Sequence, residues 1–154
     1  MKTATLLAAA SLFAAAGAAL PAAPAHAQDP VYTGLFSNTA VGGWDTVSYF
    51  SDGGPVQGRR EFTTDWQGAE WRFSSQENLD LFLADPAAYA PQYGGYCAYA
   101  VSQGGTAKGD PEVWHLHDGK LYLNVNRQIQ EVWLADLEAY IALADDNWPA
   151  VIQG

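Results

Sequence analysis

The sequence is poor in cysteine and in basic residues, and both shortages restrict what the protein can do. Cys97 is the only cysteine among 154 residues, so an intramolecular disulfide and a paired-cysteine redox or metal motif are excluded. Seven Lys and Arg stand against 17 Asp and Glu. Because so acidic a surface repels nucleic acid and anionic lipid headgroups, we expect neither as a partner. Phosphate-binding glycine loops and Ser-His-Asp spacings are also absent, and the carboxylates form no obvious acid/base pair.

The first 27 residues have the features of a cleaved signal peptide. Lys2 supplies a positive charge, and an apolar run follows from residue 4 to residue 20. Ala25 and Ala27 form the small-x-small pattern that signal peptidase requires, which predicts cleavage before Gln28. The alternative is a retained membrane anchor, which needs about 20 apolar residues and no cleavage site. We therefore expect a periplasmic or secreted protein with no membrane association after cleavage.

Residues 28–154 are predicted to form a single soluble domain. Without Lys2, six basic residues remain against the 17 acidic ones, so the net charge is about −11. No long linker, charge block or repeat divides this part of the chain, and aromatic residues are spread along it. These observations predict one continuous hydrophobic core.

The first half of the mature chain has the pattern of a strand, a hairpin and a helix. Residues 47–50, Val-Ser-Tyr-Phe, form a short apolar run that predicts a strand. Residues 61–66 and 69–74 alternate apolar and polar side chains around Gln67-Gly68, which predicts a hairpin with one apolar face. Ser74 and Glu77 have the spacing of a capping box, so a helix is expected to follow.

The second half repeats the order of hairpin and helix. Asp118-Gly119, between residues 113–117 and 120–125, is a strong signal for a two-residue hairpin turn. Asn126 is a predicted N-cap, and apolar residues at helical spacing predict one long C-terminal helix from about Arg127 to Asp146. The predicted fold class is α+β, with a small antiparallel sheet of hairpins and packed helices.

The register of the second hairpin places its two histidines on one face. A two-residue turn pairs His117 with Lys120 and His115 with Tyr122, and side chains two residues apart on a strand point the same way. Two imidazoles so placed can bind one metal ion, and copper, zinc and nickel all accept imidazole. The alternative is an ordinary solvated strand face, and Lys120 is a cation beside the proposed site.

Cys97 follows the flexible pair Gly94-Gly95 and has three interpretations. The first is a small buried apolar residue, which is the commonest role of a free cysteine. The second is a third ligand, with His115 and His117, of a soft metal ion such as copper or zinc. The third is a nucleophile, which would need one of the same histidines as its base.

Several segments resemble exported bacterial YHS-domain proteins. The opening Gly-Gly-Trp-Asp-Thr-Val-Ser-Tyr-Phe at residues 42–50 is similar to that family's Gly-Gly-Tyr-Asp-Pro-Val-Ala-Tyr-Phe. The middle of the family is matched at residues 71–78 and 85–98, and its end at residues 108–111 and 118–124. The resemblance covers nearly all of the mature chain and is most specific around Cys97.

The resemblance implies a YHS-like fold and a link to transition metals, because YHS domains occur beside copper-transporting ATPases. Its metal-binding members carry Cys after the Asp-Pro-Val element and a Cys-x-x-x-Cys-like pair where the strand enters the helix. Here Ser48 and the run Ser-Ser-Gln-Glu-Asn at residues 74–78 occupy those places, and Thr46 replaces the family's Pro. We therefore expect a non-catalytic module that handles a metal such as copper. The alternative is a structural or partner-binding module without a ligand.

Overall fold

The structure, a computed structural model, describes residues 27–51 and 53–154. The predicted signal peptide thus lies, up to residue 26, outside the described residues. The first part of the fold contains η1 (Ala40–Gly43), β1 (Trp44–Asp45), α1 (Ser48–Ser51), β2 (Val56–Gln57), β3 (Arg59–Trp66), β4 (Ala69–Phe73), α2 (Gln76–Ala84) and α3 (Pro86–Tyr89). The second part contains η2 (Gln92–Gly95), α4 (Ala98–Ser102), β5 (Asp110–His117), β6 (Lys120–Asn124), α5 (Arg127–Ala135) and α6 (Leu137–Gln153).

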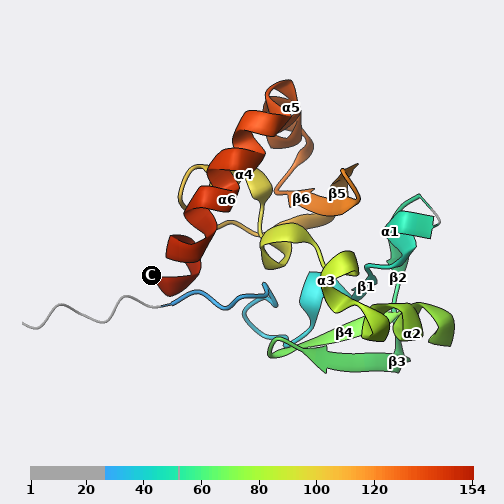
Figure 1. Cartoon of the computed structure of the whole chain (residues 1–154). Helices are drawn as coiled ribbons and strands as arrows, with labels where there is room; N and C mark the ends of the chain where they lie inside the picture. The colour runs from blue at the N-terminus through green and yellow to red at the C-terminus, as the bar shows by residue number, and fades with distance from the viewer. Residues whose placement is uncertain (1–26, 52) are drawn as a thin grey trace, which may run out of the picture.

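The predicted α+β class is confirmed. The strands pair in antiparallel twos, β1 with β2, β3 with β4 and β5 with β6. Both predicted hairpins are present, and their turns have positive φ at Gln67-Gly68 and at Asp118-Gly119, as two-residue hairpin turns require. Figure 1 shows β3–β4 with α2 and α3 at one end of the molecule, and β5–β6 with α5 and α6 at the other.

The strand predicted for residues 47–50 is wrong, because this segment begins the short helix α1. The cause lies two residues earlier, in the carboxylate of Asp45. Its Oδ1 accepts hydrogen bonds from the backbone N–H of Val47 at 2.9 Å and of Ser48 at 3.3 Å. A side chain that accepts from two successive N–H groups turns the chain into a helix and away from an extended strand.

The start of α2 lies one residue later than predicted. Ser75, and not Ser74, is its N-cap and accepts a hydrogen bond from the backbone N–H of Asn78 at 3.2 Å. Ser74 instead donates its hydroxyl to Asp45. Of the apolar side chains of α2, Leu79 and Phe82 are buried, whereas Leu83 is exposed.

The long C-terminal helix is present, but the predicted span of residues 127–146 contains two helices. Asn126 caps α5 as predicted, accepting from Ile129 at 2.9 Å. The chain then leaves the helical region at Asp136, with φ −145°, and α6 begins at Leu137. α6 also runs past the predicted end and through Pro149 to Gln153.

Buried apolar side chains form two clusters where the sequence predicted one continuous core. The first cluster joins the β3–β4 hairpin and α2 to Leu121 and Leu123 of β6. The second lies between α4, α5 and α6 and contains Trp133 and Tyr122. Because Leu121 and Leu123 point to one cluster and Tyr122 to the other, both faces of the β5–β6 hairpin are covered. No helix in the described part of the chain combines the length and apolarity that a bilayer crossing requires.

Candidate functional site

The predicted histidine register is confirmed. His115 pairs with Tyr122 and His117 with Lys120 across the β5–β6 hairpin, so both imidazoles lie on the face opposite Leu121 and Leu123. This face looks toward α5 and the start of α6. The two rings therefore lie beside these helices, and the alternative of an ordinary solvated strand face does not describe their surroundings.

The surroundings of His115 favour the neutral form of its imidazole. Its ring packs edge-on against Trp133 of α5, with centroids 5.9 Å apart and planes at 79°. Desolvation by this packing lowers the pKa of His115, and the neighbouring His117 lowers it further by charge repulsion. A neutral imidazole has a free nitrogen lone pair, which is the form that binds metal ions.

His117 lies beside two carboxylates. Its Nε2 is 3.1 Å from Oε1 of Glu138 at the start of α6 and 3.5 Å from Oδ2 of Asp118 in the hairpin turn. Both carboxylates are largely exposed, so these contacts add little to stability. They do place oxygen ligands next to an imidazole, and a carboxylate beside a ligating histidine also orients its ring.

Cys97 is buried and lies apart from this face. It is 1 % exposed, forms a parallel bridge with Leu123, and its backbone N–H donates to the carbonyl of Ala107 at 2.8 Å. Its thiol donates to Oδ1 of Asn124 at 3.7 Å, and the Nδ2 of Asn124 has no partner. The interpretation of Cys97 as a buried core residue therefore has direct support.

The predicted group of Cys97, His115 and His117 is not assembled as a metal site in the structure. Within residues 27–51 and 53–154, no three His, Cys, Asp or Glu side chains are grouped so that they could hold a metal ion. The hairpin register brings the two histidines together, but Cys97 pairs with Leu123, whose side chain points to the opposite face of β6. Any metal bound through the histidines needs its further ligands from neighbouring carboxylates or solvent.

Among the described residues, Asp45 accepts the largest number of hydrogen bonds with its side chain, and no sequence pattern pointed to it. It is 0 % exposed, and beyond the two bonds at Oδ1 its Oδ2 accepts three more. These come from the backbone N–H of Ser74 at 2.7 Å, the hydroxyl of Ser74 at 2.6 Å and the amide of Asn78 at 2.7 Å. Asp45 thus ties the start of α1 to the junction between β4 and α2.

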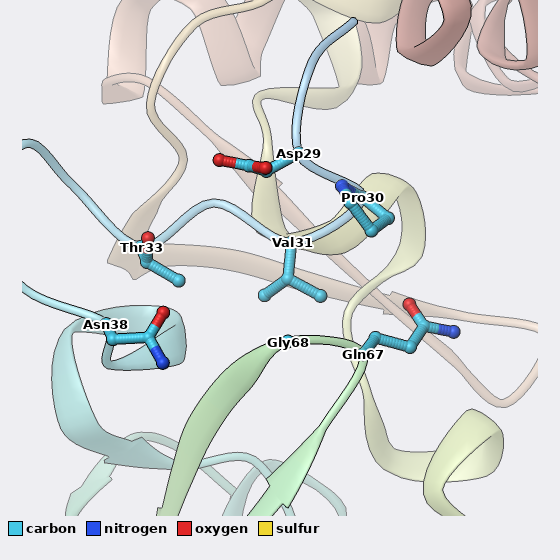
Figure 2. Close-up of a pocket in the computed structure, with 7 residues that line it drawn as sticks. All are labelled: Asp29, Pro30, Val31, Thr33, Asn38, Gln67 and Gly68. Atoms are coloured by element: carbon cyan, nitrogen blue, oxygen red, sulfur yellow. The ribbon is translucent and has the colours of Figure 1, made fainter.

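A cavity of about 340 Å³ lies between the N-terminal segment and the turn of the first hairpin. Figure 2 shows Asp29, Pro30, Val31 and Thr33 on one side, with Gln67-Gly68 and Asn38 on the other. Its lining contains one carboxylate and no histidine or cysteine. The cavity therefore offers neither an activated nucleophile nor a histidine acid/base group.

Comparison with protein families gives a match to the first half of the fold. A YHS domain is detected at residues 47–93. This range runs from α1 through the β3–β4 hairpin to η2. Comparison with curated proteins and with solved structures gave no match.

The positions that resemble the ligand positions of metal-binding YHS domains make internal hydrogen bonds here. The hydroxyl of Ser48 donates toward the carbonyls of Asp45, at 2.7 Å, and Gly54, at 2.9 Å, and accepts from the N–H of Val56 at 3.1 Å. The hydroxyl of Ser74 donates to Asp45. Since neighbouring backbone groups and the Asp45 carboxylate engage both hydroxyls, these hydrogen bonds form a structural network at the start of the matched segment.

Proposed function

We propose that this chain is an exported, non-catalytic YHS-like module that binds a divalent transition-metal ion, copper or zinc, at the β5–β6 hairpin. The observation that carries the proposal is the placement of His115 and His117 on one face, two residues apart on β5. The lowered pKa of His115 supports it, because this imidazole stays available for coordination at neutral pH.

The proposed donor set is imidazole with carboxylate or water. Glu138 is the nearest carboxylate to His117, and nitrogen with oxygen donors suits Cu²⁺ and Zn²⁺. Cys97 is left out of the donor set because it is buried and its thiol donates a hydrogen bond to Asn124. Lys120 opposes a cation electrostatically, but it is exposed, so its long side chain can place the ammonium group in solvent.

A non-catalytic role is supported by the surroundings of the one thiol. A nucleophilic cysteine needs a base within hydrogen-bond reach. The Cys97 thiol donates its hydrogen bond to the amide oxygen of Asn124, which is not a base at physiological pH. The cavity of Figure 2 is likewise lined without a histidine or cysteine.

Export is supported by the signal-peptide pattern of residues 1–27. Intact-mass measurement on protein recovered from the periplasm or medium should show Gln28 as its first residue. Recovery of the chain with Met1 or Lys2 retained would refute cleavage.

The metal proposal is tested by calorimetric titration of the mature protein with Cu²⁺ and Zn²⁺. His115→Ala and His117→Ala are each expected to weaken binding at least tenfold, whereas the matched variant Cys97→Ser should bind like the parent. For copper, nitrogen hyperfine structure in the electron paramagnetic resonance spectrum should be reduced in the histidine variants. Equal binding by the parent and the double histidine variant would refute the site.

A second candidate function is a partner-binding module without its own ligand. It is favoured by the loop between Thr33 and Ser37, where Leu35 and Phe36 are almost fully exposed. Large apolar side chains exposed side by side are typical of contact surfaces. Failure of the titrations with both metals would favour this function over the first.

A further inference from the structure

The two halves of the fold share the order of their main elements. Each begins with a 3-10 turn and continues through a short helix, a hairpin, a helix and a second helix, although the short strands β1 and β2 of the first half have only an isolated bridge as their counterpart in the described second half. We propose that residues 92–141 are a second, diverged copy of the unit formed by residues 40–90, so that the chain is a fused pair of YHS-like units. The detected YHS domain lies almost wholly within the first copy.

The backbone of the two 3-10 turns is nearly identical. Val41 has φ 52° and ψ 30°, and Tyr93 has φ 56° and ψ 34°. The following glycines agree as well, with φ 61° and ψ 17° at Gly42 and φ 60° and ψ 17° at Gly94. Positive φ is costly for a bulky or β-branched residue, so its occurrence at the same point in both halves is not an ordinary coincidence.

All non-glycine residues with positive φ in the described chain fall into equivalent pairs. There are four of them, Val41, Gln67, Tyr93 and Asp118. Val41 corresponds to Tyr93 in the 3-10 turns, and Gln67 corresponds to Asp118 in the hairpin turns, where both have φ 48°. The unusual backbone positions of one half therefore predict those of the other.

The connection between turn and hairpin is repeated in its hydrogen bonds. Trp44 bridges to Gln57 in the first half, and Tyr96 bridges to Lys108 in the second. Immediately afterwards a glycine N–H donates to the second glycine of the 3-10 turn. The pairs are Gly58 to Gly43, at 2.9 Å, and Gly109 to Gly95, at 3.2 Å.

The hairpins share the same register and the same bulge. In the first, Arg59 pairs with Phe73, and regular pairing resumes with Thr63 opposite Arg72. In the second, Asp110 pairs with Asn124, and regular pairing resumes with Trp114 opposite Leu123. Each residue of the second set follows its counterpart by 51 positions. A bulge interrupts pairing at one specific point, so its repetition at the same offset extends the equivalence residue by residue.

The helices after the hairpins repeat both the sequence and the caps. α2 ends in Leu-Ala-Asp at residues 83–85, and α5 ends in Leu-Ala-Asp at residues 134–136. In both, the Asp leaves the helical region and is also the N-cap of the next helix. Ala-Tyr follows at residues 88–89 and again at residues 139–140.

Side-chain packing within each copy is equivalent too. Trp71 of β4 stacks on Phe82 of α2, with ring centroids 5.1 Å apart. The corresponding residues of the second copy, Tyr122 and Trp133, lie 5.4 Å apart. Each copy therefore uses one aromatic pair to join its hairpin to its helix.

The copies pack against each other, so the partner of each unit is the other unit of the same chain. The hydroxyl of Tyr49 in α1 donates to the carbonyl of Pro111 in β5 at 2.7 Å. The Tyr49 ring packs edge-on against Trp114, with centroids 5.4 Å apart. Leu121 and Leu123 of the second copy complete the first hydrophobic cluster.

The equivalence also separates the chemistry of the two copies. His115 and His117 correspond to Thr64 and Trp66, so only the second copy carries imidazoles at these positions. Together with the proposed function, on which this corollary rests, the duplication predicts one metal ion per chain.

The duplication is tested on the full mature chain by nuclear magnetic resonance. Backbone chemical shifts and dipolar couplings should give positive φ at all four positions and place a bulge in both hairpins. A negative φ at Tyr93 or Asp118, or regular pairing between Asp110 and Trp114, would overturn the proposal.

A titration of the same sample with Zn²⁺ tests the corollary independently. One bound ion, with shifts confined to the second hairpin and the adjoining helix termini, would support the corollary. Shifts at the first hairpin around Thr64 would overturn the corollary. No binding would refute the proposed function, while the couplings would still decide the duplication.

Discussion

Asp45 gives the sharpest test of how the first half of the fold is held together. Its carboxylate is fully buried and accepts five hydrogen bonds, two at Oδ1 and three at Oδ2. A hydrogen bond to a charged group contributes about 1.5–3 kcal/mol, and a buried donor left unpaired costs about 1–3 kcal/mol. The five do not add, because helix-end N–H groups can be reached by water once the side chain is removed. We therefore expect Asp45→Ala to lower the free energy of unfolding by about 3–5 kcal/mol.

The assay is urea unfolding followed by tryptophan fluorescence and by circular dichroism. With an m-value of about 2 kcal/mol per molar urea, the midpoint of Asp45→Ala should fall by about 2 M. Asp65→Ala is the matched control, because Asp65 is exposed and its loss should change stability by less than about 0.5 kcal/mol. Asp45→Asn is expected to be destabilised as well, since its amide group places donors against the donors of Ser74 and Asn78. A midpoint for Asp45→Ala that matches the Asp65→Ala control would refute the reasoning.

Three further predictions concern the second half of the fold. Gly109→Ala should lower the free energy of unfolding by about 1–3 kcal/mol through overpacking, because a Cβ there would collide with the Gly95 carbonyl and lie 2.8 Å from Leu123 Cβ. The control Gly105→Ala should leave the urea midpoint unchanged, because the nearest neighbour of its Cβ would be 4.0 Å away. The pKa of His115, measured by proton magnetic resonance, should lie below the usual 6.5. The free energy of unfolding should therefore be highest above pH 6.5 and decrease as the pH falls toward the folded-state pKa. A titration midpoint of the His115 ring at or above 6.5 would contradict its packing against Trp133. Cys97→Ser should lower the free energy of unfolding by only about 1–2 kcal/mol, because a hydroxyl can still donate to Asn124. Cys97→Asp should lower it by at least about 3 kcal/mol, because it buries an unpaired charge. Equal unfolding midpoints for the two variants would contradict this account.

The hairpins were predictable from sequence because their signals are local. Gln67-Gly68 and Asp118-Gly119 are two-residue turns between alternating strands, and pairing across such a turn fixes the register on both sides. The face shared by His115 and His117 follows from that register alone. The N-cap role of Asn126 was equally predictable, since an N-cap side chain accepts a hydrogen bond from the N–H group only three residues later.

The errors arose where a distant group decided the local conformation. Residues 47–50 have the composition of a strand, but the Asp45 carboxylate fixes a helical start. That carboxylate is held in turn by Ser74 and Asn78, about 30 residues along the chain. The end of α6 was misplaced for a similar reason. Trp148 packs against Tyr93 and Tyr96, with ring centroids 5.8 and 6.0 Å away, and this contact holds the helix across Pro149.

The duplication was hidden in the sequence because the two copies keep backbone-determining residues and few others. Glycines of the turns and the Leu-Ala-Asp helix ends are retained, whereas the buried centre has changed in character. Asp45 corresponds to Cys97, and its donors Ser74 and Asn78 correspond to Val125 and Ile129, which have no polar side-chain atoms. A carboxylate without those donors would be an unpaired buried charge, so the acid and its partners must change together. In the second copy, which lacks the hydrogen-bond network of Asp45, the equivalent buried position is occupied by Cys97 beside Asn124. Packing thus explains its presence, and the proposed metal site needs only the histidine face of the same copy.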